Sequence, residues 1–139
     1  MESTVTLTDG MAFRADLDGH QITIDANAEF GGNDRGPRPK TLLLTSLAGC
    51  TAMDVISILR KMRQDVSSFS VSASGTLTEE HPKTLVDLQV RYEVEGDVAE
   101  GKLRRAVELS EDRYCGVSAM LKDHTSISST IVLNGVTLA

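Results

Sequence analysis

Hydrophobic residues are densest between Pro39 and Arg63, where apolar side chains recur at a helical period and also occupy the remaining helix faces. Pro39 suits the first turn of a helix, because its missing N–H would have no partner there. The basic residues Arg60, Lys61 and Arg63 complement the negative end of a helix dipole. We therefore predict one long helix that is buried on nearly all sides.

The same stretch raises the question of a membrane span, since the segment from Leu42 to Leu59 is long enough to cross a bilayer. Asp54 is costly in lipid, however, and Ser and Thr recur along the segment. A hydrophobic helix inside a soluble core explains the sequence better, so no membrane partner is expected.

Short strands are predicted before this helix. Their alternating residues are separated by the dipeptides Asp9-Gly10 and Asp18-Gly19, which favour tight hairpin turns. The run from Phe30 to Arg38 is rich in Gly and Pro, so it is predicted to be the loop that leads into the helix. The predicted strands lie at residues 4–8, 11–15 and 21–26.

Two long segments after the helix alternate strictly between apolar and polar residues, which predicts an antiparallel strand pair with one wet face. The order of all elements predicts a segregated α+β fold rather than a βαβ winding. The elements predicted in this half are strands at 69–77, 86–95 and 125–133, an amphipathic helix at 103–111 and a short helix at 115–121.

A helix that is apolar on every side needs cover on every side, and this chain predicts few other elements to supply it. Ala48, Gly49 and Ala52 would allow another helix or strand to approach closely. The alternative is that Gly49 makes room for a neighbour in the same chain. We favour a second copy of the chain, and therefore expect a homodimer.

The composition narrows the class of protein. A chain of 139 residues is of ordinary size for one domain, so residues 1–139 are expected to form a single domain. Lys and Arg total 14 against 20 for Asp and Glu, and the net charge of −6 argues against a nucleic-acid partner. The first residues have neither a basic start nor a long apolar run, so a cytoplasmic location is expected.

The chemistry of the chain depends on its two cysteines, Cys50 and Cys115. Cys50 lies deep inside the predicted helix, where the dipole lends little acidity, and Asp54 one turn on would oppose ionisation. Cys50 would therefore need an arginine from elsewhere. Cys115 is predicted to begin a helix, where free N–H groups would make its thiol the more readily ionised of the two. The alternative is that both cysteines are buried and inert.

Other chemistry has little support in the sequence. His20, His81 and His124 share no short spacing with each other or with the cysteines, so no metal site is predicted. Gly31-Gly32-Asn33 is not followed by the Gly-Lys-Ser/Thr of a phosphate loop. No serine on the long helix has an adjacent histidine to act as a base, as serine hydrolysis requires.

Two segments, LAGCTAMD at 47–54 and YCGVS at 114–118, resemble the OsmC/Ohr family of thiol peroxidases, and in particular its short OsmC-like branch. The resemblance extends over nearly the whole chain. It implies an α+β, OsmC-like fold with antiparallel-rich sheets packed on a long central buried helix, and an intertwined dimer. It also implies reduction of organic hydroperoxides, with Cys50 as the peroxidatic residue, Cys115 as the resolving residue, a thiol or dithiol reductant and no cofactor.

One feature of the family is missing. Its members usually place a glutamate nine or ten residues before the first cysteine, where it holds an arginine over the sulfur, but here those positions are Thr41 and Lys40. The resemblance leaves Arg14, Arg35 and Arg38 as candidates for the arginine, and Arg38 ranks first because it is closest to the helix start. Slower thiol chemistry is one alternative. A non-enzymatic dimer that binds an apolar ligand between its subunits is another.

Overall fold

The computed structural model describes residues 1–139, and its strands and helices confirm the α+β class. The chain divides into two units, Met1–Leu43 and Leu44–Ala139, which are described separately. The helix α1 (Pro39–Lys61) begins in the first unit and continues in the second, and its bounds agree with the predicted long helix.

The first unit contains a three-stranded antiparallel sheet in the order β1-β2-β3. All three predicted strands are present, and Gly10 and Gly19 turn the hairpins with φ angles of 57° and 79°, a region that favours glycine. A short 3₁₀ helix, η1 (Ala28–Phe30), follows the sheet. The strands are β1 (Ser3–Asp9), β2 (Ala12–Leu17) and β3 (His20–Ile24).

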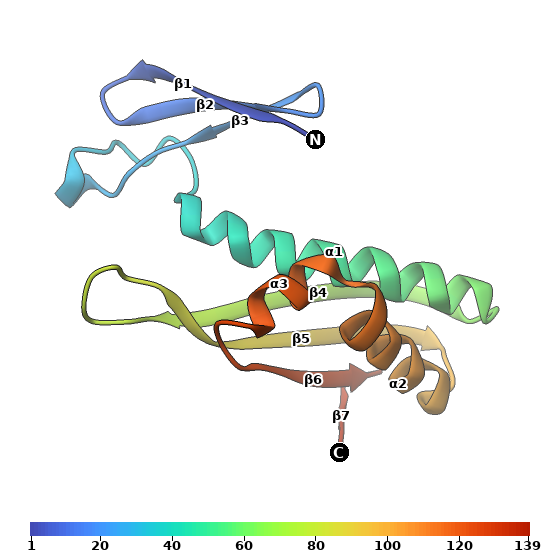
Figure 1. Ribbon diagram of the computed structural model, residues 1–139. Coiled ribbons are helices and arrows are strands. Elements are labelled where there is room, and N and C mark those ends of the chain that lie inside the picture. The colour runs from blue at the N-terminus through green and yellow to red at the C-terminus, as the bar shows by residue number, and fades with distance from the viewer. The chain divides into compact units, whose positions relative to one another are not determined.

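The second unit contains a four-stranded sheet in the order β4-β5-β6-β7, with helices packed against it (Figure 1). The predicted antiparallel pair is formed by β4 (Asp65–Leu77) and β5 (Leu85–Asp97). Along β5 every second side chain is buried, from Leu88 to Val94, while the residues between them are exposed. The alternation in the sequence therefore identifies which face of β5 packs into the core.

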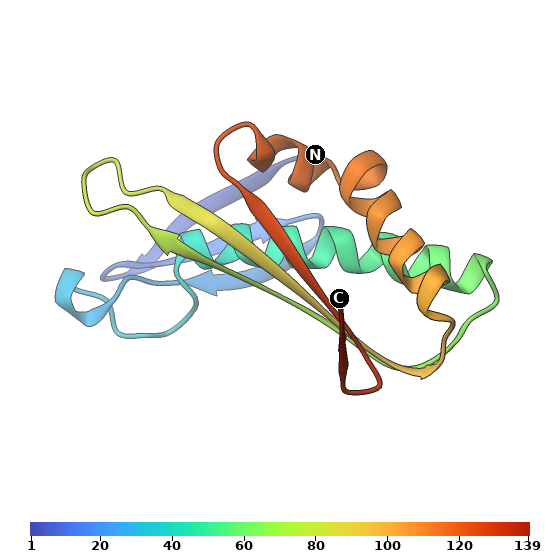
Figure 2. The same cartoon turned by 90° about the horizontal axis from the view of Figure 1, so that it is seen from below.

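The connection after β5 differs from the predicted segregated order. The chain runs through α2 (Glu100–Leu109), a π-helical turn η2 (Ser110–Tyr114) and α3 (Gly116–Lys122). It then returns as β6 (Ile127–Leu133), which pairs with β5 in parallel, so one βαβ crossover is present after all. A short strand that was not predicted, β7 (Val136–Leu138), turns back beside β6 (Figure 2).

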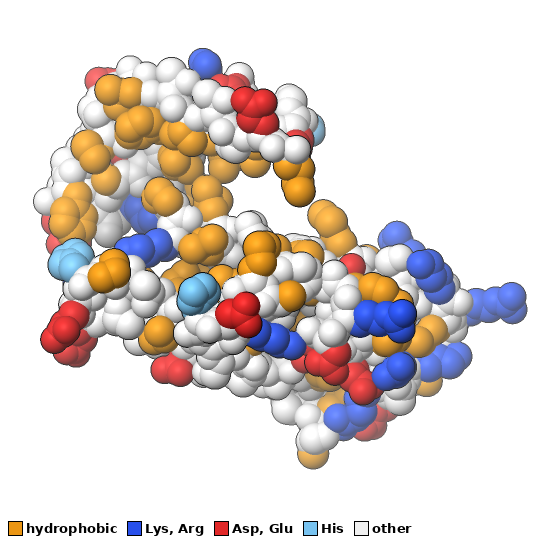
Figure 3. Space-filling model, in the orientation of Figure 1, with side chains coloured by type: hydrophobic (Ala, Val, Ile, Leu, Met, Phe, Trp, Pro, Cys, Tyr) orange, Lys and Arg blue, Asp and Glu red, His pale blue; other side chains and the backbone are white.

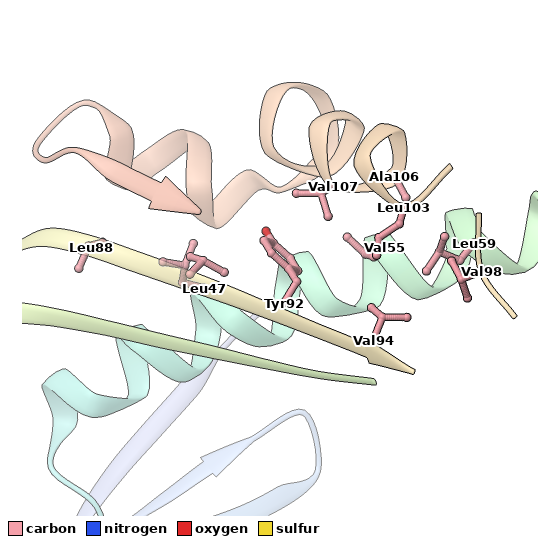
Figure 4. Packing of buried hydrophobic residues seen from close by; sticks show 11 residues of the cluster. Leu47, Val55, Leu59, Leu88, Tyr92, Val94, Val98, Leu103, Ala106 and Val107 are labelled. Atoms are coloured by element: carbon pink, nitrogen blue, oxygen red, sulfur yellow. The ribbon is translucent and has the colours of Figure 1, made fainter. Parts of the chain in front are cut away.

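The core of the second unit lies where α1, β5 and α2 meet (Figure 4). Apolar side chains from each element contact one another there, with Tyr92 of β5 fully buried among them. The cluster consists of Leu47, Val55, Leu59, Leu88, Val90, Tyr92, Val94, Val98, Leu103, Ala106 and Val107.

The prediction that α1 is buried on nearly all sides is wrong for the single chain. Its buried residues are Leu47, Thr51, Val55 and Leu59, which form one stripe at a spacing of four. The side chain of Met53 is 74% exposed, and hydrophobic side chains are visible along the surface of α1 (Figure 3). The sheet and the flanking helix of this chain cover only one stripe of α1, so the apolar side chains on its other faces stay exposed.

By length and composition alone, α1 is also the one helix that could cross a membrane, with a mean hydropathy of 1.8 over its most apolar window. Leu47, Val55 and Leu59 lie in the core cluster together with β5 and α2. Only 22% of that window is buried in the single chain, however, so the absence of a membrane partner stays a prediction.

Candidate functional site

The fold brings the two cysteines together inside the second unit. Cys50 lies in the middle of α1 and Cys115 lies at the junction of η2 and α3. Both thiols are free, and their sulfur atoms and a carboxylate oxygen of Asp54 all lie within 4.8 Å of one another. Cys50 and Asp54 are half-buried, whereas Cys115 is only 3% exposed.

A π-helical turn sets the position of Cys115. The amide of Cys115 donates a hydrogen bond to the carbonyl oxygen of Ser110, five residues earlier, at 2.8 Å. Cys115 then caps α3, because its sulfur accepts a hydrogen bond from the amide of Ser118 at 3.3 Å. The hydroxyl of Ser118, in the same turn, is buried and has no hydrogen-bond partner. The predicted short helix that begins at Cys115 is therefore confirmed.

A buried polar network joins Asp54 to β5 and η2. The hydroxyl of Thr51 lies 2.8 Å from both the Tyr92 hydroxyl and the Ser110 hydroxyl. Ser110 donates to Oδ2 of Asp54 at 3.1 Å, and Tyr92 donates to Oε1 of Glu111 at 3.1 Å. The three hydroxyl groups have only three protons for these four contacts, so the network is fully bonded only if a further proton is present.

Burial decides the acidity of Cys115. Desolvation raises the pKa of its thiol to about 11, and the amide of Ser118, which favours the thiolate, does not offset this. Cys50 and Asp54 raise the pKa further through their proximity. The prediction of a readily ionised Cys115 is therefore wrong, since the helix start supplies one N–H while the surrounding core removes water.

Burial in the same core also changes the acidity of Tyr92. Burial raises the pKa of its phenol, and the carboxylate of Glu111 adds to that effect, although the Thr51 hydroxyl opposes it. Tyr92 is therefore a neutral hydrogen-bonding group at any ordinary pH, able to donate to Glu111.

A surface pocket of about 360 Å³ adjoins this site. Asp54 belongs both to the pocket lining and to the group that contains the two sulfur atoms. The other lining residues come from α1 and the turn that follows it, and from the end of α2 and η2: Ser57, Ile58, Lys61, Met62, Leu109 and Tyr114. A small molecule in the pocket would therefore contact apolar side chains such as Ile58, Met62 and Leu109 as well as the polar groups of Asp54, Ser57 and Lys61.

The three candidate arginines lie in the first unit, each with an acidic partner there. Arg14 pairs with Asp16 at 3.1 Å, and Arg38 pairs with Asp34 at 2.7 Å. Arg38 also donates to the side-chain oxygen of Asn27 and to the carbonyl oxygen of Gly36. Arg35 pairs with Asp9 at 3.3 Å and lies 3.7 Å from Asp25. The role of Arg38 beside Cys50 stays a prediction.

Sequence reasoning missed the polar network, although it contained signals for it. Tyr92 stands at an inward position of the β5 alternation, and a buried phenol requires a hydrogen-bond partner. Ser110 likewise stands on the apolar stripe of the helix predicted at 103–111. Polar residues on inward faces indicated a network, but the partners of each could not be identified without the fold.

Comparison with known proteins places the chain among relatives of the same architecture. A family model described as "OsmC-like protein" matches residues 31–130. Protein YhfA of Escherichia coli (strain K12) is 35% identical over 130 residues, which cover 92% of this chain and 94% of YhfA.

Solved structures with the same fold are found as well. The crystal structure of a hypothetical protein from Aquifex aeolicus VF5 superposes with a TM-score of 0.81 at 32% identity, covering 96% of each chain. An organic hydroperoxide resistance protein from Elizabethkingia anophelis superposes with a TM-score of 0.74 at 15% identity, covering 96% of this chain and 97% of the other. At 15% identity, the likeness to the Elizabethkingia protein shows a shared fold alone.

Proposed function

Because this chain belongs to the OsmC-like protein family, we propose that it reduces organic hydroperoxides with the Cys50–Cys115 pair. One observation carries the proposal: the fold brings two free thiols, far apart in the sequence, within 4.8 Å of each other. The name of the Elizabethkingia relative, an organic hydroperoxide resistance protein, supports the choice of substrate.

The proposed reaction has two chemical steps. The thiolate of Cys50 attacks the terminal oxygen of the hydroperoxide, the O–O bond breaks, and the alkoxide takes up a proton and leaves as an alcohol. Cys50 is then a sulfenic acid. The sulfur of Cys115 displaces its hydroxyl group, which leaves as water with the thiol proton, and a disulfide forms. A thiol or dithiol reductant, in the proposed cytoplasmic setting, restores both thiols.

Burial supports this division of roles. Cys50 is half-buried, so a hydroperoxide can reach it, whereas Cys115 is 3% exposed. The pKa of Cys115 is raised to about 11, so its thiol remains protonated near neutral pH and makes a poor first nucleophile. Cys115 is nevertheless close enough to react with an oxidised Cys50. In the pocket beside Asp54, the side chains of Ile58, Met62 and Leu109 offer apolar contacts for the alkyl group of the substrate.

The proposal gives Arg38 the task of stabilising the Cys50 thiolate. The family resemblance supports an arginine in that role, and Arg38 precedes α1 directly. Its ion pair with Asp34 involves a carboxylate that is 82% exposed, and such pairs contribute little to stability. Contact with Cys50 would also require Arg38 to give up its hydrogen bonds to Asn27 and to the carbonyl oxygen of Gly36.

Alanine variants of the three candidate arginines test this assignment. Arg38→Ala should slow oxidation of Cys50 by cumene hydroperoxide about tenfold or more, because a charged donor to the reacting sulfur is lost. Arg14→Ala and Arg35→Ala remove the same charge from the other two candidates, and a slower reaction in one of them, with Arg38→Ala unchanged, would move the role to that arginine. If Cys50 is oxidised at the parent's rate in all three variants, none of these arginines takes part in the mechanism.

We also propose that the functional form is a homodimer in which α1 is covered by the second copy. Met53 and Leu43 on α1 are 74% and 48% exposed in the single chain. A Cβ atom added at Gly49 would meet nothing within 4 Å, so no neighbour in this chain requires glycine there. Both observations favour a close approach by another subunit over the intrachain alternative for Gly49.

Counting free thiols tests the proposed activity. Reduced protein, freed of reductant, is mixed with cumene hydroperoxide, and the remaining thiols are measured with a chromogenic disulfide. About two thiols should be lost for each hydroperoxide consumed. Cumyl alcohol, which has the same apolar group but no O–O bond, should consume none. Unchanged thiols beside unconsumed hydroperoxide would favour the alternative of a non-enzymatic module that binds an apolar ligand.

A further inference from the structure

The side chains around Cys50 offer donor atoms for a metal ion, which peroxide chemistry does not use. Cys50, Asp54 and Cys115 offer two sulfur atoms and one carboxylate oxygen, all within 4.8 Å of one another. We propose that the reduced protein binds a single thiophilic divalent cation through these three side chains, and that Zn²⁺ is the ion whose ligand preferences they match.

The spacing of the donor atoms suits a tetrahedral ion. With Zn–S bonds of about 2.3 Å and a Zn–O bond of about 2.0 Å, tetrahedral geometry separates the two sulfur atoms by about 3.8 Å. It separates each sulfur from the oxygen by about 3.5 Å. The observed upper limit of 4.8 Å lies about 1 Å above these values, a difference that small side-chain rotations can close.

The backbone holds the three donors on regular elements. Cys50 and Asp54 are four residues apart on α1, so their side chains lie on one face of the helix, as in other helical metal-binding pairs. Cys115 comes from the N-cap of α3. The sequence alone predicted no metal site because its histidines share no short spacing, and because Cys50 and Cys115 meet only in the fold.

Neighbouring groups are arranged as an outer shell for such an ion. Ser110 donates to Oδ2 of Asp54, which fixes that carboxylate and leaves its other oxygen free to bind. The amide of Ser118 donates to the sulfur of Cys115, an interaction that favours the thiolate form. A cation would also compensate the charge of a Cys115 thiolate, which lies in the core with only 3% of the residue exposed.

Binding exchanges protons for the cation. Two thiols lose their protons to solvent, the carboxylate of Asp54 supplies the third donor, and water fills the fourth position. A sulfur that holds the cation is a weaker nucleophile, so the bound ion shields Cys50 from oxidation. Formation of the disulfide removes two of the three donors and releases the ion. The inference uses the same side chains as the proposed function but does not rest on it.

Cadmium is the probe for the first experiment, because its thiolate complexes absorb in the ultraviolet. Reduced protein should bind Cd²⁺ at about one ion per chain, release about two protons, and lose the ion only to a large excess of Zn²⁺, because thiolates prefer the softer Cd²⁺. The disulfide form should not bind. A parent protein that binds Cd²⁺ no better than Cys115→Ser would overturn the proposal.

Matched carboxylate variants test whether Asp54 is a ligand. Asp54→Asn keeps the shape of the side chain and can still accept from Ser110, but it should weaken Cd²⁺ binding by about tenfold or more. Glu111→Gln removes the same charge from the other end of the polar network and should bind within about twofold of the parent. Equal affinities in the two variants would contradict the proposed donor set.

A second measurement uses the parent protein alone, so it does not depend on how a variant folds. X-ray absorption of the Zn²⁺-loaded protein should fit two sulfur neighbours near 2.3 Å and two oxygen neighbours near 2.0 Å. Four sulfur neighbours would mean that two chains share the ion, and would overturn the proposal. The thiol count with hydroperoxide is independent of both experiments, so either conclusion can fail while the other stands.

Discussion

At the scale of single residues, one buried carboxylate organises the loop that leads into α1. The side chain of Asp25 is fully buried and accepts hydrogen bonds from the backbone amides of Ala26, Asn33 and Arg35 at 2.8, 3.0 and 3.2 Å. Burial alone would raise the pKa of Asp25, but these three amides and the charge of Arg35 hold it below the usual 3.8. Asp25 therefore closes the loop as an ionised group.

This makes the stability of the first unit dependent on pH in acid. Because the pKa of Asp25 is lower in the folded chain than in the unfolded chain, its stabilisation is complete above about pH 4. It is lost as the pH falls through the lower, folded value. Thermal unfolding between about pH 5 and 2 should show a steeper loss for the parent than for Asp25→Asn, which should be less stable at neutral pH.

Asp16→Asn is the matched control, since its carboxylate lies on β2 and is partly exposed. The thermal stability of Asp16→Asn should fall with decreasing pH as steeply as that of the parent. An Asp25→Asn protein that retains both the parent's neutral-pH stability and its acid slope would contradict the role given to Asp25.

Cys115 shows why residue-level chemistry is the hardest part to predict from a sequence. Its position at the start of a helix was predicted correctly, and the amide of Ser118 does reach its sulfur. What the sequence did not reveal was the loss of water around it, which raises the pKa to about 11. Desolvation depends on elements that are distant in the chain, while a helix cap depends on neighbours.

At the scale of elements, the polar network links α1, β5 and η2 through hydroxyl groups inside an apolar core. Tyr92→Phe should lower the free energy of unfolding by about 1–2 kcal/mol, because Glu111 and Thr51 each lose a buried hydrogen-bond partner while the ring packing is kept. Tyr114→Phe is the control, since Tyr114 is 53% exposed and should change stability by less than about 0.5 kcal/mol.

Urea unfolding followed by circular dichroism measures both variants. Equal midpoints for Tyr92→Phe and the parent would mean that the hydroxyl of Tyr92 adds nothing to the packing of α1 against β5.

Elements with strong periodicity were predicted well, and the reasons are local. The unbroken alternation of β5 and the Pro-led apolar run of α1 each identify their element without help from the rest of the chain. The parallel pairing of β6 was missed because strand direction depends on where α2 and α3 carry the chain. The strand β7 was missed because it has only three residues, although Asn134-Gly135 before it favours a tight turn.

At the scale of the whole molecule, the exposed apolar side chains of α1 predict association. Lys and Arg side chains gather over α2 and the end of α1, away from its apolar middle (Figure 3). Met53→Lys places a charge on that apolar surface and should weaken the dimer by about tenfold or more, because the charge would be desolvated on binding. Sedimentation velocity over a range of concentrations measures the change.

Met120→Lys is the matched control, since Met120 is 66% exposed and lies on α3 rather than α1, and it should leave association unchanged. A parent protein that remains a folded monomer across micromolar concentrations would contradict the proposed dimer.

The central claim is that Cys50 reacts first with a hydroperoxide and Cys115 resolves the product. Intact-mass measurement after one equivalent of cumene hydroperoxide tests it most directly, using the parent and the two single serine variants. The parent should lose two hydrogens as a disulfide forms, Cys115→Ser should gain oxygen at Cys50, and Cys50→Ser should not change. Oxygen gain at Cys115 in Cys50→Ser, at a rate like the parent's, would contradict the account.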